Sequence, residues 1–504
     1  MYAGTFPVIT AEEAASHIQD GTMVALSGFS NAGTAKLVPL AIAKRAREIH
    51  AAGKPYRIRL ITGSSSGNDI DEELAQAEAV SWRAPFQSAP TLRSQINSQQ
   101  VQYIDMHLSH APQTLLAGFF GKLDYAIIEA ADVTRDGRVY LTTSIGASPT
   151  YLRYADRVFI EINNYHSKRL PEMADIVVLP PPPRVDPIPI HDPLTKIGYP
   201  YAVVDPRKII GIIETDVPDQ IEPFTPMDWR ARSIADNVVR FLFGEMISGR
   251  IPPEFLPLQA GVGNLANSVM AALGSNPYIP PFKMYSVTFQ NSLVDLMEKG
   301  KLLGASACSL TLTADTLKHI CSNMDFFAPR IVLRPQDISD DAGVVRRLGV
   351  IAINPAIEVD IYGNVNSSHF FGTDIMNGIG GSGEFTRNSY ISIIMCPSTV
   401  MGGRISCIVP MSPHIDSNEH SVQVIVTEQG FADLRGKGPM QRAKKIIDNC
   451  AHPAYRDYLH AYIREPGSGH IRHNLRKAYE LHRNFLEYGR MLPDLNLAEV
   501  GDRI

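Results

Sequence analysis

Short apolar runs rich in β-branched residues alternate along the chain with longer amphipathic stretches. Met23–Ser27 and Arg57–Thr62 have the pattern of buried strands, and Lys36–His50 between them has the spacing of an amphipathic helix. Strands separated by helices predict parallel sheets that are covered by helices. Ligands of such sheets bind at the carboxyl ends of the strands, so the loops that follow strands are the first candidates for a site.

The same alternation continues to about Gly430, after which the pattern is mostly helical. Further strands are predicted at Asp124–Ala130, Arg157–Asn163, Ile176–Leu179, Lys208–Glu214, Lys283–Gln290, Arg330–Arg334, Gly349–Ile353, Ile357–Tyr362, Tyr390–Cys396, Ile405–Met411 and Val422–Thr427. A chain of 504 residues is too long for one ordinary core. Asp216–Met227 is loose in composition, and Asp228 is a candidate N-cap for a helix to about Ile247. We therefore expect two α/β domains, 1–225 and 226–504.

Composition narrows the function classes. Hydrophobic residues make up 44% and charged residues 20% of the chain, with a net charge of −5 and no clustered basic face, so we expect no nucleic-acid partner. The N-terminus resembles neither a signal peptide nor an anchor, and no apolar run approaches the roughly 18 residues that span a bilayer. The five cysteines form no CxxC pair, which favours a reducing compartment and therefore a cytoplasmic protein. Because no apolar run is long enough to span a bilayer, we also expect no membrane contact.

Three glycine-rich loops are candidates for ligand contact. Gly261–Asn267 (GVGNLAN) precedes an apolar helix, where small residues allow close approach and backbone N–H groups attract anions or a developing oxyanion. The GxGxxA spacing also occurs in dinucleotide-binding turns, but those need an acid about 20 residues on, and Tyr278–Phe282 contains none. Asn377–Phe385 (NGIGGSGEF) is dense in Gly and Ser, which favours ligand contact over packing. The third loop, Ser27–Gly33, follows the first predicted strand and is either a site for the acyl group or acid, or a structural turn.

Polar clusters elsewhere are less specific. HIDSNEH places two histidines and two acids in one polar loop, which we interpret as solvated rather than as a metal site. The histidines of the C-terminal region are interpreted as surface or interface residues. Glu428 follows a predicted strand and is either a site residue or a helix cap. These residues are His414, Asp416, Glu419 and His420 in the loop, and His452, His460, His470 and His473 near the C-terminus.

Six longer segments are specific enough to suggest a family. They are Leu256–Asn267, Asp360–His369, Met376–Phe385, Ile405–Met411, Val426–Gly436 and Gln441–Leu459. In this order they resemble the acetyl-CoA hydrolase/transferase family, within the class I CoA-transferases, and the resemblance extends over almost the whole chain. RIPPEFLPLQ from Arg250 and IPPFKMYS from Ile279 are most similar to bacterial members that use propionyl-CoA and succinate.

The resemblance implies two similar open-sheet α/β domains with flanking helices and an active site between them. It implies ping-pong transfer, in which a glutamate forms an acyl anhydride and then a thioester with coenzyme A. The resemblance also implies that coenzyme A is a substrate, that no cofactor is tightly bound, and that the protein forms a homodimer. Backbone N–H groups near Val262 and Gly381 would form the oxyanion hole. The positions implied to contact CoA are Gly261, Val262, Gly263, Asn264, Leu265, Ile357, Asn377 and Gly381.

Two positions depart from the family pattern. Tyr285 and Gln290 fix the register, so Val287 occupies the position of the nucleophilic glutamate, and Thr288 beside it is also altered. In the segment that resembles PSxxKGGK, Met401 replaces a lysine that contacts CoA, and Arg404 lies close enough in sequence to substitute in part.

The expected function is transfer of CoA between a short acyl-CoA (acetyl-, propionyl- or succinyl-CoA) and a small carboxylic acid, or hydrolysis of the acyl-CoA. Because valine has no lone pair, no thioester can form at Val287. Three explanations stay open: another acid such as Glu428 or Glu384 activates water, the chain is a catalytically impaired CoA-binding protein, or a local alteration has been introduced into an ordinary transferase.

Overall fold

The computed structural model describes residues 4–183, 186–221, 228–465 and 468–494. It divides into two compact units, Met1–Pro223 with Lys283–Leu348 and Asn377–Gly381, and Phe224–Phe282 with Gly349–Met376 and Ser382–Ile504. The expected boundary near residue 225 lies outside the described residues, and a single boundary there stays a prediction.

The first unit is built on a seven-stranded sheet in the order β10-β8-β5-β1-β2-β3-β4, all of whose pairings are parallel. Because its strands are buried on both faces, they consist of nearly continuous apolar runs. The strands are β1 (Met23–Leu26), β2 (Ile58–Ile61), β3 (Val80–Ala84), β4 (Gln102–Tyr103), β5 (Tyr125–Ala130), β8 (Arg157–Asn163) and β10 (Ile209–Thr215).

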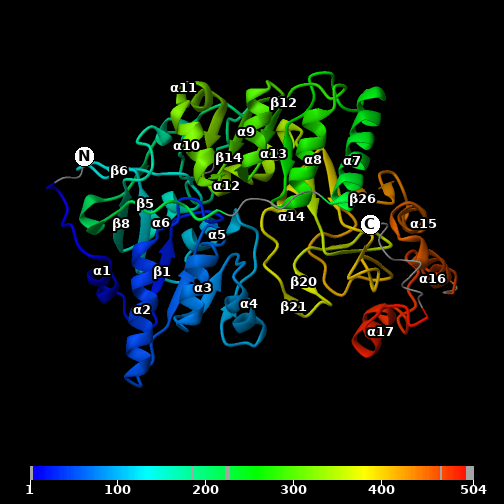
Figure 1. The fold of residues 1–504 in the computed structure, drawn as a ribbon, viewed down its shortest axis with the longest axis horizontal. Helices are drawn as coiled ribbons and strands as arrows, with labels where there is room; N and C mark the ends of the chain where they lie inside the picture. The colour runs from blue at the N-terminus through cyan, green and yellow to red at the C-terminus, as the bar shows by residue number, and fades with distance from the viewer. Residues whose placement is uncertain (1–3, 184–185, 222–227, 466–467, 495–504) are drawn as a thin grey trace. The chain divides into compact units, whose positions relative to one another are not determined.

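Helices beside this sheet pack in series, α1 against α2, α2 against α3 and α3 against α4, and Figure 1 shows α2 and α3 alongside β1. The buried Glu161 of β8 links the sheet to α2, because its carboxylate accepts hydrogen bonds from the N–H groups of Lys36, Leu37 and Val38 at 2.6, 3.1 and 2.7 Å. The helices are α1 (Ala11–His17), α2 (Leu37–Ala51), α3 (Asn68–Gln76), α4 (Pro90–Asn97), α5 (His110–Leu116) and α6 (Ser148–Tyr154).

Residues 283–348 add further elements to the first unit. In this segment β13 pairs with β15 and β14 with β16, in parallel. A small antiparallel sheet, β6-β7-β9, completes the unit. The bounds are β6 (Asp132–Val133), β7 (Arg138–Tyr140), β9 (Ala202–Val203), β12 (Phe282–Tyr285), β13 (Thr288–Gln290), β14 (Leu302–Ala307), β15 (Ser309–Thr311), β16 (Ile331–Leu333), α9 (Asn291–Glu298), α10 (Ala314–Ser322), α11 (Met324–Phe327), α12 (Gln336–Ser339) and α13 (Ala342–Leu348).

The second unit has a sheet with the strands in the order β11-β17-β22-β26-β27. The first four are parallel, and β27 returns antiparallel to β26. Helices α7, α8, α14 and α15 pack against these strands. The bounds are β11 (Leu258–Ala260), β17 (Ile351–Pro355), β22 (Ile391–Met395), β26 (Val424–Thr427), β27 (Gly430–Asp433), α7 (Trp229–Ile247), α8 (Asn264–Ser275), α14 (Ser382–Asn388) and α15 (Pro439–Cys450).

Smaller elements surround this sheet. They are β18 (Glu358–Asp360), β19 (Val365–Asn366), β20 (His369–Phe370), β21 (Asp374–Ile375), β23 (Thr399–Val400), β24 (Ile405–Ser406), β25 (Ile408–Val409), α16 (Pro453–Arg464) and α17 (Glu480–Tyr488). A core cluster of this unit joins β18, β25 and β26 to α15 and α16. Among the described residues, no helix is long and apolar enough to cross a bilayer.

The predicted fold class is confirmed, and four element predictions need correction. The predicted strand Ile405–Met411 is two short strands, β24 and β25. Ile176–Leu179 is not a strand, because only Ile176 forms a bridge, to Tyr199. The run Lys283–Gln290 is broken at Ser286-Val287 into β12 and β13. The strand β27 follows Gly430, where the sequence predicts helix, because it pairs with β26 before the chain turns into α15. Asp228 caps α7 as predicted, accepting from Ala231 N–H at 2.7 Å.

Candidate functional site

Val287 lies in the break between β12 and β13. Its backbone is held against a neighbouring segment, because Ser286 N–H donates to Ser306 at 2.9 Å and Val287 C=O accepts from Cys308 N–H at 2.8 Å. The pairing of β13 with β15 continues this contact at Thr288. Residue 287 is therefore fixed by backbone hydrogen bonds on both sides, and its side chain alone determines what chemistry it offers.

The Val287 side chain packs against an apolar cluster. Phe29, Leu108 and Cys308 form its buried centre, and Phe86 and Val287 pack against them. Phe29 comes from the loop Ser27–Gly33, so this loop contributes packing to the environment of Val287. The surroundings of Val287 are thus apolar on this side.

Two nucleophilic side chains near Val287, those of Cys308 and Thr288, are not activated. Burial raises the pKa of the Cys308 thiol well above its usual range, and the charge of Asp340 raises it further, so the thiolate does not form. The Cys308 sulfur donates to Val287 C=O at 3.0 Å. The Thr288 hydroxyl is buried and accepts from Gln290 Nε2 at 3.2 Å.

The second glycine loop is anchored in the first unit through Asn377–Gly381. Tyr103 OH donates to Asn377 C=O at 2.6 Å, and Ile379 N–H donates to Asp105 Oδ1 at 2.9 Å. A Cβ at Gly378 would lie 2.8 Å from both Asp105 Oδ1 and Tyr103 Oη, so glycine is required there for close approach. The predicted positions Asn377 and Gly381 belong to a loop whose backbone is held in one conformation.

Asp340 lies against the same loop, and the sequence reasoning did not predict it. A Cβ built on Gly381 would lie 2.7 Å from Asp340 Oδ2 and 3.2 Å from Val287 Cγ2, so both side chains contact one glycine. Asp340 is 1% exposed and ends α12, donating its N–H to Gln336 C=O at 3.0 Å. In the sequence, an aspartate after a short helical run is typical of an ordinary turn, so no local signal identifies it.

In the second unit, several predicted residues meet at the carboxyl edge of one parallel sheet. Gly261 follows β11 and donates to Ile353 C=O at 2.9 Å on the adjacent strand β17. Ile357 follows β17 and donates to Asn366 C=O at 2.9 Å. Glu428 follows β26, which is parallel to the same strands. The structure therefore brings together residues that the sequence separates by more than 160 positions.

The first glycine loop has open space at its centre. Gly263 is the N-cap of α8 with φ +115°, and a Cβ there would meet no atom within 4 Å. Val262 is 50% exposed, and Asn264 is exposed as well. A glycine at positive φ that begins a helix of 12 residues suits an approaching anion.

The carboxylate of Glu428 accepts hydrogen bonds within a turn of the second unit. Its carboxylate accepts from Ser398 N–H at 2.8 Å, from Ser398 Oγ, and from Gln429 Nε2 at 3.2 Å. Glu384 is buried in α14 of the same unit. Arg404 donates through Nε to Met401 C=O at 3.0 Å, while the Met401 side chain is exposed.

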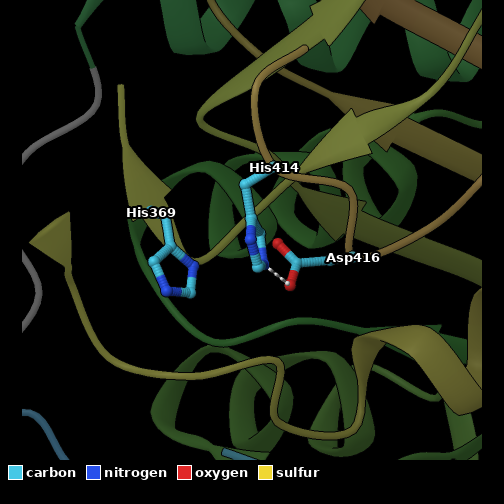
Figure 2. Close-up of side chains that lie close together, drawn as sticks. All are labelled: His369, His414 and Asp416. Carbon is cyan, nitrogen blue, oxygen red and sulfur yellow. Dashed lines mark hydrogen bonds and ion pairs between the residues drawn. The ribbon is translucent and has the colours of Figure 1, made fainter. Parts of the chain in front are cut away.

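Two residues of the predicted loop of histidines and acids lie beside a histidine from another part of the chain. His414 and Asp416 come together with His369, which lies 45 positions earlier, and Figure 2 shows His414 directed at Asp416. His414 Nε2 and Asp416 Oδ1 are 3.1 Å apart, and the rings of His369 and His414 have centroids 3.8 Å apart. Burial, followed by the charge of His414, lowers the pKa of His369.

Asp416 also accepts from Ser367 N–H at 2.6 Å and from Ser368 Oγ at 2.7 and 2.8 Å. These bonds tie the loop of Asp416 to residues 367–369. His420 pairs instead with Glu419, at 3.7 Å. The contacts of the carboxylate are those of a loop anchor, and the interpretation of this loop as free of metal stays a prediction.

The C-terminal histidines have structural partners. His452 Nδ1 accepts from Ala454 N–H at 3.3 Å as the cap of α16, and His460 Nε2 lies 2.9 Å from Asp448. His473 Nδ1 lies 3.0 Å from Tyr462 OH, and His470 is exposed.

Comparison with known proteins gives this arrangement a family. The acetyl-CoA hydrolase/transferase N-terminal domain matches residues 5–214, and the C-terminal domain of the same family matches residues 317–463. The chain belongs to the acetyl-CoA hydrolase/transferase family. This confirms the resemblance that the sequence segments carry.

Similar members of the acetyl-CoA hydrolase/transferase family include enzymes of both kinds. Propanoyl-CoA:succinate CoA transferase of Escherichia coli is 54% identical over 96% of this chain and 98% of its own. Succinyl-CoA:acetate CoA-transferase of Clostridium kluyveri is 42% identical over 96% of this chain and 90% of its own. Acetyl-CoA hydrolase of Schizosaccharomyces pombe is 38% identical, over 95% of this chain and 94% of its own.

Solved structures share the fold. RipA from Yersinia pestis has a TM-score of 0.69 at 23% identity and covers 90% of this chain and 96% of its own. 4-Hydroxybutyrate CoA-transferase from Porphyromonas gingivalis has a TM-score of 0.61 at 21% identity, over 91% of this chain and 97% of its own. At these identities the likeness shows the two-domain α/β fold of the family.

Proposed function

We propose that this protein binds coenzyme A and short acyl-CoA and transfers CoA between an acyl-CoA and a small carboxylic acid. The observation that carries the proposal is the meeting of Gly261 and Ile357, both implied to contact CoA, at the carboxyl edge of one parallel sheet. Similarity to named CoA transferases over nearly the whole chain supports the same reaction class. Acetyl-, propionyl- or succinyl-CoA is the proposed donor.

The proposed CoA contacts are the two glycine loops and Ile357. The N–H groups that begin α8 after Gly263 suit a phosphate or an oxyanion, and the backbone near Gly381 is the second proposed donor group. The contacting residues are Gly261, Val262, Gly263, Asn264, Leu265, Ile357, Asn377 and Gly381. Coenzyme A is proposed as a substrate, without a tightly bound cofactor or a metal ion.

Hydrolysis of acyl-CoA is the second candidate. A relative named acetyl-CoA hydrolase supports it, and so does the valine at residue 287, because hydrolysis does not require an enzyme thioester. The third candidate is a CoA-binding protein without turnover. The three differ in what they predict for binding and for product formation.

Isothermal titration calorimetry with CoA and with propionyl-CoA tests the binding step. We expect saturable binding below 1 mM, and its absence at that concentration would contradict all three candidates. Turnover assays with propionyl-CoA follow, with and without succinate or acetate. Succinate-dependent formation of succinyl-CoA identifies a transferase, release of free CoA without acceptor identifies a hydrolase, and binding without either product identifies a binding protein.

A Val287→Glu variant tests the register. We expect it to raise the transfer rate, because it restores a carboxylate at the family's nucleophile position. Val294→Glu, on the buried face of α9, is the matched control and is expected to destabilise the fold without gain of activity. An unchanged rate in a folded Val287→Glu protein would show that residue 287 is misassigned.

We further propose a cytoplasmic homodimer without nucleic-acid or membrane partners. The five cysteines are unpaired, with four of them buried, which suits a reducing compartment. Sedimentation velocity checks the dimer, which would appear as a single species of twice the 55.4 kDa chain mass.

A further inference from the structure

We propose that Asp340 is the catalytic nucleophile of this chain, the carboxylate that carries the acyl group and then CoA in place of an acid at residue 287. This inference rests on the proposed transfer function and identifies the group that performs it.

The position of Asp340 follows from its closeness to Gly381, and its charge also affects Cys308. Asp340 Oδ2 and Val287 Cγ2 lie 2.7 and 3.2 Å from the point that a Cβ on Gly381 would occupy, so the two side chains approach the same side of this glycine. Asp340 also acts electrostatically on Cys308, whose sulfur bonds the carbonyl of Val287 at 3.0 Å. The carboxylate therefore lies beside the side-chain position where the family's acid would be, and beside the glycine loop proposed to contact the thioester.

The surroundings favour direct attack over activation of water. Asp340 is 1% exposed, and the cluster of Phe29, Leu108 and Cys308 with Val287 forms an apolar wall near it. In its ionised form, a carboxylate held in such a poorly hydrated position attacks without first losing a hydration shell. An apolar wall also limits the water that would hydrolyse an acyl intermediate.

Other nucleophiles near residue 287 are disfavoured. The Cys308 thiol stays protonated because burial raises its pKa, and the buried Thr288 OH accepts from the amide of Gln290, which is not a base. Glu428 of the second unit is engaged by Ser398 and Gln429, which leaves it suited to holding a turn. Among these described residues, Asp340 is the acid that lies, like Val287, beside the Cβ position of Gly381.

The reaction balances without a cofactor or redox step. One Oδ of Asp340 attacks the acyl-CoA carbonyl, the C–S bond breaks, and CoA thiolate leaves an acyl-aspartyl anhydride. The thiolate attacks Cγ of Asp340, which expels the first carboxylate with an oxygen from Asp340 and forms an aspartyl-CoA thioester. The acceptor carboxylate attacks this Cγ, expels the thiolate and forms a second anhydride. Thiolate attack on the acceptor acyl carbon then releases the new acyl-CoA and restores Asp340.

Borohydride trapping tests the assignment. The protein is incubated with propionyl-CoA and then with borohydride, which reduces an aspartyl thioester to an alcohol, and peptides are mapped by mass spectrometry. We expect homoserine at position 340. With ¹⁸O-labelled succinate as acceptor, we expect the label to enter Asp340 during turnover. An adduct on any other residue, or turnover without an adduct, would overturn the proposal.

Substitutions give a second, independent measurement. We expect Asp340→Asn to lower the transfer rate by about 1,000-fold or more while the affinity for CoA stays within a few fold. Asp337→Asn is the matched control, because Asp337 is a buried aspartate of the same short helix that lines a separate apolar cavity with His110 and Tyr154. We expect it to leave transfer unchanged. Full activity in Asp340→Asn would exclude a nucleophilic role.

The double variant Val287→Glu with Asp340→Asn separates loss of the nucleophile from loss of the fold. We expect it to regain activity over Asp340→Asn alone, with the trapped adduct moved to position 287. If the wild type fails to bind CoA, the proposed function itself is wrong. If the wild type binds CoA and turns over while Asp340→Asn does the same, the function holds and only the assignment of Asp340 is wrong.

Discussion

At the scale of single residues, the chemistry of this chain depends on which side chains surround Gly381. Val287 contributes methyl groups that cannot bond to an acyl carbon, and Asp340 contributes a carboxylate against the same glycine. The glycine matters because any Cβ would enter the space between them. A methyl group at residue 381 therefore tests this packing directly.

Gly381→Ala is expected to displace the Asp340 carboxylate, because the new Cβ would lie 2.7 Å from Oδ2, closer than van der Waals contact permits. We expect a loss of about 1–3 kcal/mol in the free energy of unfolding and a reduced transfer rate. Urea denaturation and the transfer assay measure the two effects. Gly244→Ala in α7 is the control, because no atom lies within 4 Å of its Cβ, and it should stabilise by roughly 0.5–1 kcal/mol. Equal behaviour of the two variants would contradict the crowding at Gly381.

At the scale of elements, helices are attached to sheets by a few buried polar groups. The carboxylate of Glu161 on β8 accepts from three N–H groups at the start of α2, which no side chain of the helix itself caps. Burial raises the pKa of Glu161, and the three N–H donors act in the opposite direction. The strand therefore supplies the cap that the helix sequence lacks.

Glu161→Ala is expected to destabilise the first unit by about 2–5 kcal/mol, because it leaves the buried N–H groups of α2 without their acceptor. Thermal denaturation followed by circular dichroism measures the change. Glu214→Ala on the neighbouring strand β10 is the matched control, since its side chain is exposed, and it should change stability by no more than about 0.5 kcal/mol. A loss below 1 kcal/mol for Glu161→Ala would show that water or another group replaces the cap.

At the scale of the whole molecule, buried ionisable groups make stability depend on pH. Burial, with a further contribution from the charge of Asp341, raises the pKa of Asp337 to about 7. Its side chain lines an apolar cavity of ≈ 470 Å³ that also includes His110. Burial of the carboxylate in such surroundings favours its neutral form, while hydrogen bonds from the N–H groups of Asp337 and Ile338 act in the opposite direction.

The sign of the pH effect follows from proton binding. Between about pH 4 and pH 7 the folded protein holds the Asp337 proton while the unfolded chain has released it. The contribution of Asp337 to the free energy of unfolding therefore falls by up to roughly 4 kcal/mol as pH rises through that window. Above the window this contribution is constant. We expect Asp337→Asn to remove this part of the dependence, measured as the difference between wild type and variant in urea denaturation at about pH 5 and pH 8. Parallel curves would contradict the raised pKa.

Much of the architecture is encoded locally. Apolar runs such as Arg157–Asn163 predict buried parallel strands because a strand covered on both faces must be apolar throughout, and β8 has the predicted bounds. Asp228 predicts the start of α7 because an N-cap carboxylate satisfies a backbone donor of the first turn. Where tertiary contacts compete, local pattern is insufficient, as in Lys283–Gln290, which the backbone bonds of Ser286 and Val287 divide into two strands.

The sequence by itself determined the family and the α/β class, because these depend on residue identity and on periodicity along the chain. Only the tertiary structure decided which residues become neighbours. It brought His369 to His414, placed Phe29 against Val287, and set Asp340 against Gly381 from a turn 41 positions away in the chain. The physical reason is that backbone hydrogen bonds and apolar packing, which form only in the folded chain, bring loops together whatever their separation in sequence.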